Sequence, residues 1–218
     1  FKMSATGGSD VYINNPSALV APGRRRGYVK LKELSWPAII DAYRVQRIFV
    51  TYGPYIMFTA NGQEMGGTLV LPATGGNVVC KLEAGHVYGV TAVDIIQNGH
   101  VIKTLKPAGE SRTLSETLTL EVTRSGWLAM ACHGRQGEFF GNWAHTAPLY
   151  LQVGEQPLTP AAEDIAFFGK WLADLRSAIE GLAKSQHWSR QMFEPYLQKI
   201  TAAESVYREL PQQPRRWQ

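Results

Sequence analysis

Apolar and polar residues follow two different periods along this chain, and the period changes near residue 159. From Ile48 to Val153, β-branched and aromatic residues form short runs with turn residues at every eight to twelve positions or so, which is typical of antiparallel strands. After Thr159, apolar residues recur at steps of three and four, which is typical of amphipathic helices. The pattern therefore predicts a β-rich region followed by helices.

The β-rich region is predicted to contain short strands joined by tight turns. Asn61-Gly62 and Asn98-Gly99 predict hairpins, because both residue types tolerate positive φ. The first hairpin is expected to pair 55–59 with 68–71. Gly53 before Pro54 predicts a sharp turn with an unusual φ at the glycine. The predicted strands cover 28–32, 48–51, 55–59, 68–71, 77–83, 89–97, 100–105, 113–123, 126–132 and 147–153. This number and spacing favour an Ig-like antiparallel β-sandwich.

Helix signals flank the strands. Ser35 is a suitable N-cap for a short helix that begins with Trp36 and Pro37. Thr159 is expected to cap a long helix with Pro160 in its first turn, ending near residue 184. A second apolar stripe runs to about residue 210 after a connector at 186–189. The two stripes predict an antiparallel helical hairpin at the C-terminal end.

Composition excludes some functions and leaves others open. The formal net charge is only +4, and the arginine clusters at 24–26 and 215–216 lie in Pro/Gly-rich stretches, so we expect no nucleic-acid partner. No apolar run is long enough to span a membrane, so no membrane partner is expected either. Cys80 and Cys132 fall in predicted strands and are either buried free thiols or a disulfide pair.

The histidines offer no self-contained metal motif. None of the five occurs in an HxH or HExxH pattern. His86 and His100 neighbour predicted turns and are expected to be exposed, and His133 ends a predicted strand as a turn residue. His145 lies in the segment GNWAHTAP at 141–148, which is predicted to be a loop that leads into a strand. It is either a structural histidine bonded to backbone or a functional one.

One carboxylate has a setting that suits a ligand. Asp10 follows Gly7-Gly8 at the expected end of a strand, where it either forms a turn or N-cap or presents an oxygen to a metal ion. GxSxG and GxxxxGK[ST] motifs are absent. On residue patterns alone, the chain is interpreted as a β-sandwich module with a helical hairpin.

Motifs in one consistent order resemble those of a known family. They are GGSD at 7–10, RGYV at 26–29, DAYRVQRIFVTYGP at 41–54, FTANGQEMG at 58–66, IIQNG at 95–99, SGWLAMACHG at 125–134 and AHTAPLYL at 144–151. This series resembles the C-terminal portion of the carbaryl-hydrolase-like (CehA/McbA) branch of the PHP-type metallohydrolases, over nearly the whole chain. Tyr12, Gln46 and His133 stand where that family often has His, Gly and Arg.

The resemblance implies a metal-dependent hydrolase whose catalytic domain lies upstream of this chain. Asp10 would be a late metal ligand, and His145 the candidate catalytic residue. Tyr12, Tyr52, Asn142 and Trp143 would line the substrate cleft. A divalent Zn, Mn or Fe ion is expected in the full-length protein, whereas this chain alone is expected to hold no metal tightly and to be inactive.

The same resemblance gives a division of the chain. Residues 1–46 would be the last strand and loop of a truncated PHP-like α/β domain with a connecting helix. Residues 47–158 would form the sandwich, 159–210 the helical hairpin and 211–218 a loose tail. The upstream catalytic domain is the expected partner, together with a possible homo-oligomer. The competing hypothesis is a non-catalytic module that binds a carbohydrate or protein through the sandwich and assembles through the hairpin.

Overall fold

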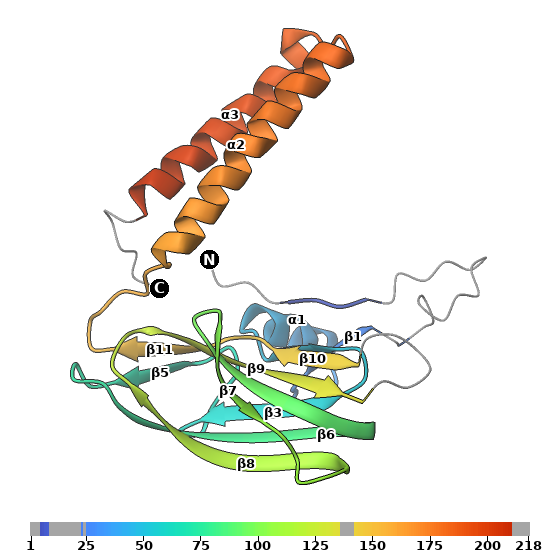
Figure 1. Cartoon of the computed structure of the whole chain (residues 1–218), viewed down its shortest axis with the longest axis vertical. Coiled ribbons are helices and arrows are strands. Elements are labelled where there is room, and N and C mark those ends of the chain that lie inside the picture. Colours follow the sequence, from blue (N-terminus) through green and yellow to red (C-terminus); the bar gives the residue numbers. More distant parts are fainter. Residues whose placement is uncertain (1–4, 9–22, 24, 136–141, 211–218) are drawn as a thin grey trace. The chain divides into compact units, whose positions relative to one another are not determined.

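The computed structural model describes residues 5–8, 23, 25–135 and 142–210, which belong to two compact units (Figure 1). The first unit spans Phe1–Gln156 and the second Pro157–Gln218. The division predicted at residue 46 does not coincide with a boundary between units, because a strand before it pairs with the strand after it. Asp10, Tyr12 and the tail at 211–218 lie outside the described residues.

The described part of the first unit is built mainly from strands, with one short helix. Its elements are β1 (Arg26–Val29), α1 (Trp36–Arg44), β2 (Ile48–Thr51), β3 (Tyr55–Ala60), β4 (Gln63–Glu64), β5 (Thr68–Leu71), β6 (Gly76–Gln97), β7 (His100–Leu105), β8 (Ser111–Val122), β9 (Gly126–Gly134), β10 (Trp143–Thr146) and β11 (Leu149–Val153). The strands form one curled sheet that is antiparallel except where β5 runs parallel to β11. A mainly β fold with helices is therefore confirmed.

The sheet curls because the long strand β6 changes its partners. Its first part pairs with β3 and β8, and its second part pairs with β7 and β9. The register breaks between Gly85 and Val90, and Gly89 in this break has φ +111°. Figure 1 shows β3, β6 and β8 along one side of the curl and β9, β10 and β11 along the other.

The core lies inside the curl. Alternate residues of β6 are buried, at Val78 and Leu82 before the break in register and at Val93 and Ile95 after it, and they join apolar residues from the facing strands. Cys80 and Cys132 are buried free thiols in this core. Burial raises the pKa of Cys80 to about 11.

Several predicted strands and turns differ from the structure. Positive φ at Asn61-Gly62 and Asn98-Gly99 confirms both turns, but the first leads into β4, and β5 pairs with β11 instead of β3. Gly66, at φ +80°, packs so tightly on the backbone of residues 45–46 that a Cβ would lie 1.9 Å from the Val45 carbonyl oxygen. This approach turns the chain away from β3.

Two further expectations are corrected. The strands predicted at 77–83 and 89–97 are one continuous strand, because the bulge after Gly85 bends β6 without ending it. Residues 143–146, expected in a loop, form β10 between β2 and β9. Because this strand has only four residues and a partly polar composition, the sequence does not show the alternating pattern that predicts a strand.

The caps of the helices are partly as predicted. Ser35 Oγ accepts a hydrogen bond from the Ala38 N–H (3.3 Å), which confirms the N-cap of α1. In the second unit, α2 (Ala162–Ser185) begins after Ala161 without a side-chain cap, so the predicted cap at Thr159 is wrong. The following helix, α3 (Arg190–Glu209), contains Pro195 in its second turn.

The second unit is a pair of helices with a narrow apolar seam. Its buried residues are Leu172, Ala183 and Ile200, and the rings of Phe168 and Tyr207 stack at 5.5 Å. The predicted helical pair is therefore present. No helix in the described residues has the length and apolar character needed to cross a membrane.

Candidate functional site at the ends of β2, β9 and β10

Three strand ends meet at one end of the curled sheet. The Tyr52 N–H, just after β2, donates to the Trp143 carbonyl at the start of β10 (2.9 Å). The Gly134 N–H at the end of β9 donates to the Asn142 carbonyl (2.7 Å). These bonds gather residues that are far apart in sequence. We call them the strand-end site: Tyr52, His86, His133, Asn142, Trp143 and His145.

The site has two faces, and the strand register separates them. Ala144 lies opposite Cys132, and both side chains belong to the core. Because successive side chains alternate between faces of a strand, the neighbours of these two residues point away from the core. Trp143, His145 and His133 are such neighbours, so they occupy the outer face of the sheet.

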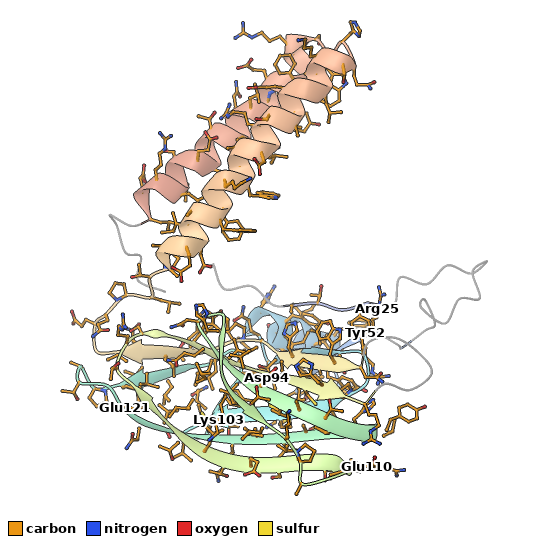
Figure 2. The ribbon with its side chains drawn as sticks, viewed as in Figure 1. Arg25, Tyr52, Asp94, Lys103, Glu110 and Glu121 are labelled. Atoms are coloured by element: carbon orange, nitrogen blue, oxygen red, sulfur yellow. The ribbon has the colours of Figure 1, made fainter. Side chains whose placement is uncertain are left out.

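Aromatic and imidazole rings form a row on the outer face. The Tyr52 and Trp143 ring centroids are 5.0 Å apart, and the Trp143 and His145 rings stack at 5.5 Å with an interplanar angle of 3°. The Arg25 guanidinium lies 5.0 Å from the Tyr52 ring centroid, and Figure 2 shows both at the same end of the sheet. Trp143 is 37% exposed, so the row is accessible from solvent.

A contact with the backbone holds one ring nitrogen of His145 and leaves the other one unbonded among the described residues. Its Nδ1 lies 3.1 Å from the Thr146 carbonyl oxygen, which can only accept a hydrogen bond. In the neutral ring the proton is therefore assigned to Nδ1, and Nε2 carries the lone pair. Packing against Trp143 fixes the plane of the ring. This arrangement suits a base or a ligand, and it equally fits a structural histidine bonded to backbone.

His133 forms a second fixed imidazole on the outer face. Its Nε2 lies 2.8 Å from Asp94 Oδ2, and Thr104 Oγ1 donates to the other carboxylate oxygen (2.6 Å). His133 belongs to β9 and is not a turn residue. On the core side, burial and the nearby charge of Asp94 raise the pKa of Cys132 to about 12, so this thiol stays protonated.

His86 is the third fixed imidazole, and its predicted exposure is wrong: only 6% of the residue is accessible. It lies where β6 bends, and its Nδ1 is 3.2 Å from the Gly89 carbonyl oxygen. The ring fits between two glycines. A Cβ on Gly53 would lie 2.8 Å from His86 Nε2, and a Cβ on Gly134 would lie 2.8 Å from Nδ1.

The close approach of the His86 ring therefore explains why residues 53 and 134 are glycines. The unusual φ predicted for Gly53 is not observed, because its φ lies outside the positive range. Thr51 Oγ1 instead holds the turn, accepting from the Gly53 N–H (2.8 Å) and donating to the Pro54 carbonyl (2.6 Å).

The structure brings together only part of the predicted site. Tyr52, Trp143 and His145 are neighbours on the outer face, whereas Asn142 lies on the core side near His86 and Gly134. His86 and Asp94 were missed. The glycines of the YGP and CHG motifs were the available signal for His86, since each leaves room for its ring.

Of the GGSD motif, Gly7 and Gly8 are among the residues that the structure describes. A Cβ on Gly7 would lie 3.3 Å from the Arg26 carbonyl oxygen, so the first glycine of the motif lies against β1. Asp10 and Tyr12 are outside the described residues. Within 5–8, 25–135 and 142–210, no three His, Cys, Asp or Glu side chains group so that they could hold a metal ion. A complete metal site therefore does not fit these residues.

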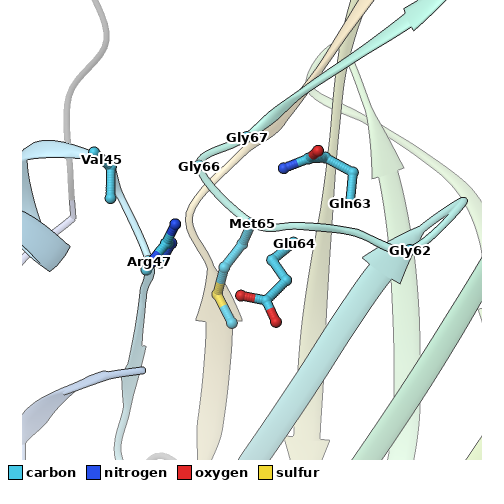
Figure 3. A pocket seen from close by; sticks show the side chains of 8 residues that line it. All are labelled: Val45, Arg47, Gly62, Gln63, Glu64, Met65, Gly66 and Gly67. Carbon is cyan, nitrogen blue, oxygen red and sulfur yellow. The ribbon is translucent and has the colours of Figure 1, made fainter. Parts of the chain in front are cut away.

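A pocket of about 280 Å³ lies elsewhere on the first unit, between residues 62–67 and the segment before β2. Figure 3 shows Arg47 beside Val45, across from the short strand β4, which carries Gln63 and Glu64. Glu64 is also paired with Lys30. The pocket shares no residue with the strand-end site.

No family model matches the chain, and no curated protein matches it. Among solved structures, the chain is similar to a lytic polysaccharide monooxygenase from Jonesia denitrificans studied by neutron crystallography, at 14% identity and a TM-score of 0.29. The match covers 40% of this chain and 58% of that structure, so the chain spans less than two thirds of its length. A similarity this low supports no statement about fold or function.

Proposed function

We propose that this chain is the C-terminal accessory region of a metal-dependent hydrolase that acts on an ester, carbamate or phosphoester. The convergence of motif residues carries the proposal. Tyr52, His133 and His145 belong to three of the motifs that resemble the carbaryl-hydrolase-like family, and strand pairing brings them to one end of the sheet. Gly7, from a fourth motif, lies against β1, the strand next to β2.

In this proposal the curled sheet is an Ig-like sandwich, and residues before it are the remainder of a PHP-like domain. The upstream domain supplies the other ligands of a Zn, Mn or Fe ion, and Asp10 adds one. The divalent ion would supply an activated water as the nucleophile. The strand-end site faces the upstream domain and completes the cleft, with His145 Nε2 available to the substrate. The chain alone is inactive.

The test uses the full-length protein that contains the upstream domain. Hydrolysis of p-nitrophenyl acetate, 1-naphthyl N-methylcarbamate and bis(p-nitrophenyl) phosphate is measured with and without EDTA, and again after Zn²⁺ or Mn²⁺ is restored. We expect activity that EDTA removes and metal restores. His145→Ala should lower kcat by about 100-fold if it transfers a proton. Absence of metal-dependent turnover on all three substrates would contradict the proposed function.

A matched variant separates the role of His145 from general damage. His100→Ala removes an exposed histidine from β7, outside the strand-end site, and should keep the wild-type kcat. If His145→Ala and His100→Ala have the same kinetics as the wild type, His145 does not belong to the active site. This result would not contradict the hydrolase proposal, because metal-dependent turnover tests that proposal separately.

The second candidate is a non-catalytic binding or assembly module. The row of Tyr52, Trp143 and His145 on an accessible sheet face favours it, because aromatic rows are common in binding surfaces. On α2, Phe167 and Trp171 are also exposed and would suit an oligomer interface. Quenching of Trp143 fluorescence by soluble oligosaccharides, lost in Trp143→Ala, would support the binding module over the enzyme.

A further inference from the structure

We propose that one exposed apolar face of the helical pair binds the same face of a second copy of the chain, so that two pairs form a four-helix bundle. The face is built from both helices of the second unit, α2 and α3 (Figure 1). This inference rests on the assembly role in the second candidate function, and it names the partner. We call the surface the hairpin face, and its residues are Phe167, Trp171, Leu182, Met192, Tyr196 and Val206.

The hairpin face follows a second apolar stripe on each helix. On α2 the stripe passes through positions 167, 171, 178 and 182, which hold Phe, Trp, Ala and Leu. On α3 it passes through positions 192, 196, 203 and 206, which hold Met, Tyr, Ala and Val. Steps of three, four and seven return to the same side of a helix. Each helix therefore carries one apolar stripe in the seam and another beside it.

An ion pair shows that the two exposed stripes lie on the same side of the helical pair. On α2, Arg176 lies one turn after the buried Leu172, and the exposed Trp171 lies around the helix in the opposite direction. On α3, Glu204 and Val206 lie in opposite directions from the seam in the same way. Because Arg176 bonds to Glu204 (2.9 Å), these two residues mark one side of the seam, and the hairpin face is on the other side.

The helical pair covers few apolar residues by itself. Among its described residues only Leu172, Ala183 and Ile200 are buried, whereas the six residues of the hairpin face are 39% to 64% exposed. Units this small are commonly stabilised by disulfides, metals or association. Both cysteines of the chain lie in the core of the sheet, so no disulfide links the helices. The hairpin face supplies a surface for association.

The hairpin face is large enough for a stable dimer. At about 150–250 Å² for a whole aromatic side chain, its exposed fractions amount to about 600 Å² of mostly apolar surface. A patch of this size is at the upper end for monomeric proteins. Two copies face to face would remove about 1,200 Å² from water, which reaches the lower limit of specific interfaces. Aromatic residues such as Trp171 and Tyr196 commonly contribute most of the binding energy.

Charge favours a second copy over a lipid surface. From Ala162 to Glu209, six Lys and Arg residues are balanced by seven Asp and Glu residues, so the formal net charge is −1. Helices that lie on membranes are typically rich in Lys and Arg, which attract anionic lipids. A net charge close to zero instead leaves little repulsion between two copies. A two-fold dimer also uses one self-complementary surface twice, and it is the commonest oligomer.

The first experiment measures the mass of the whole chain by sedimentation equilibrium at about 1 to 100 μM, because dimer formation depends on concentration. We expect a mass that rises from 24.2 kDa toward twice this value. Trp171→Ala should raise the Kd of the dimer by about 30-fold or more. Trp36→Ala removes an exposed tryptophan from α1, outside the hairpin face, and should keep the wild-type Kd. A monomer at every concentration would overturn the proposal.

A matched pair of variants tests which side of the helices is covered. Ala178→Glu places a charge on the hairpin face, and Ala173→Glu places the same charge on the side of Arg176, at another exposed alanine of α2. We expect Ala178→Glu to raise the Kd by about 100-fold and Ala173→Glu to keep it. Far-UV circular dichroism checks that both variants stay helical. In the wild type, hydrogen exchange in peptides from 162–209 should slow as the dimer forms, and this measurement needs no variant.

Two results would assign the hairpin face differently and overturn the proposal. Equal Kd values for Ala178→Glu and Ala173→Glu would show that the dimer uses another surface. A monomer that binds phosphatidylcholine vesicles through Trp171 would assign the face to lipid. Quenching of Trp143 by oligosaccharides and metal-dependent hydrolysis do not require the dimer, so the failure of this inference is distinguishable from the failure of either proposed function.

Discussion

The strand-end site and the helical pair are held together in different ways. In the strand-end site, hydrogen bonds between residues distant in sequence bring the parts together, such as the Tyr52 N–H on the Trp143 carbonyl and the His133 ring on Asp94. In the helical pair, apolar residues at steps of three and four form the seam. A repeating local pattern is thus enough to define the hairpin, whereas the site exists only once the sheet has closed.

The two regions also differ in the depth of their cores. The sheet encloses a large cluster of buried apolar residues, whereas in the helical pair only Leu172, Ala183 and Ile200 are buried. A two-helix seam removes little apolar surface from water, so each contact contributes less. We therefore expect substitutions in the sheet to have the larger effects on stability.

The largest effect is expected for Phe58→Ala. The ring is 1% exposed at the centre of β3, so its removal leaves a cavity and should lower the free energy of unfolding by about 3–5 kcal/mol. Hydrogen exchange measured by mass spectrometry, in increasing urea, would report this loss in peptides from 48–153.

The neighbouring substitution Met57→Ala is the control, because this side chain points to the other face of β3 and is only partly buried. It should cost about 1 kcal/mol or less. Equal losses for the two variants would mean that the inside of the curl is not the main core.

The hairpin should be less sensitive. Ile200→Ala removes a buried side chain from the seam, and we expect a loss of about 2 kcal/mol, at the low end for this exchange, because the surrounding residues are partly exposed and can relax. Hydrogen exchange in peptides from 162–209 measures it. Lys199→Ala, at an exposed neighbouring position, is the control. A loss as large as that of Phe58→Ala would contradict the difference in core depth.

These differences explain what the sequence could predict. The 3.6-residue period gave both long helices and their connector, and Asn-Gly pairs located two turns with positive φ. Such signals lie within a few residues of each other, so they need no knowledge of the fold. The Ser35 cap of α1 is of the same kind.

The site could be predicted only in fragments. The row of Tyr52, Trp143 and His145 comes from strand pairing between β2 and β10, and β10 is too short and polar to stand out. His86 next to turn residues was expected at the surface, yet the curl of β6 buries it between two glycines. Contacts between distant segments decide both cases.

Gly53→Ala tests whether the site is as tightly fitted as the core. The added Cβ would lie 2.8 Å from His86 Nε2 and must displace the ring, which we expect to cost about 1–2 kcal/mol. Thermal unfolding and the NMR signals of the His86 ring would show the change. Gly76→Ala, with no atom within 4 Å of the new Cβ, is the matched control and should be close to neutral. Unchanged His86 ring signals in Gly53→Ala would show that the turn at 51–54 moves to accommodate the new Cβ.

The smallest effect is expected for the ion pair between the two helices. Arg176 on α2 and Glu204 on α3 form this contact, which is distant in sequence (2.9 Å). Hydrogen bonding from Arg176, together with the charges of Arg176 and Arg208, lowers the pKa of Glu204 and outweighs the opposing effect of burial. Because the folded state favours the ionised carboxylate, its stabilising effect is present above the ordinary pKa of about 4.3 and is lost as the pH falls through the lowered value.

The stability of the helical pair is measured by hydrogen exchange in peptides from 162–209 at several pH values between about 6 and 3. The wild type should therefore lose more stability over this pH range than Glu204→Gln. Glu194→Gln removes a carboxylate whose partner, Arg190, is on the same helix, and it should keep most of the wild-type pH dependence. If Glu204→Gln and the wild type lose stability equally, the contact between α2 and α3 adds nothing to the apolar seam, and the hairpin is held by its local pattern alone.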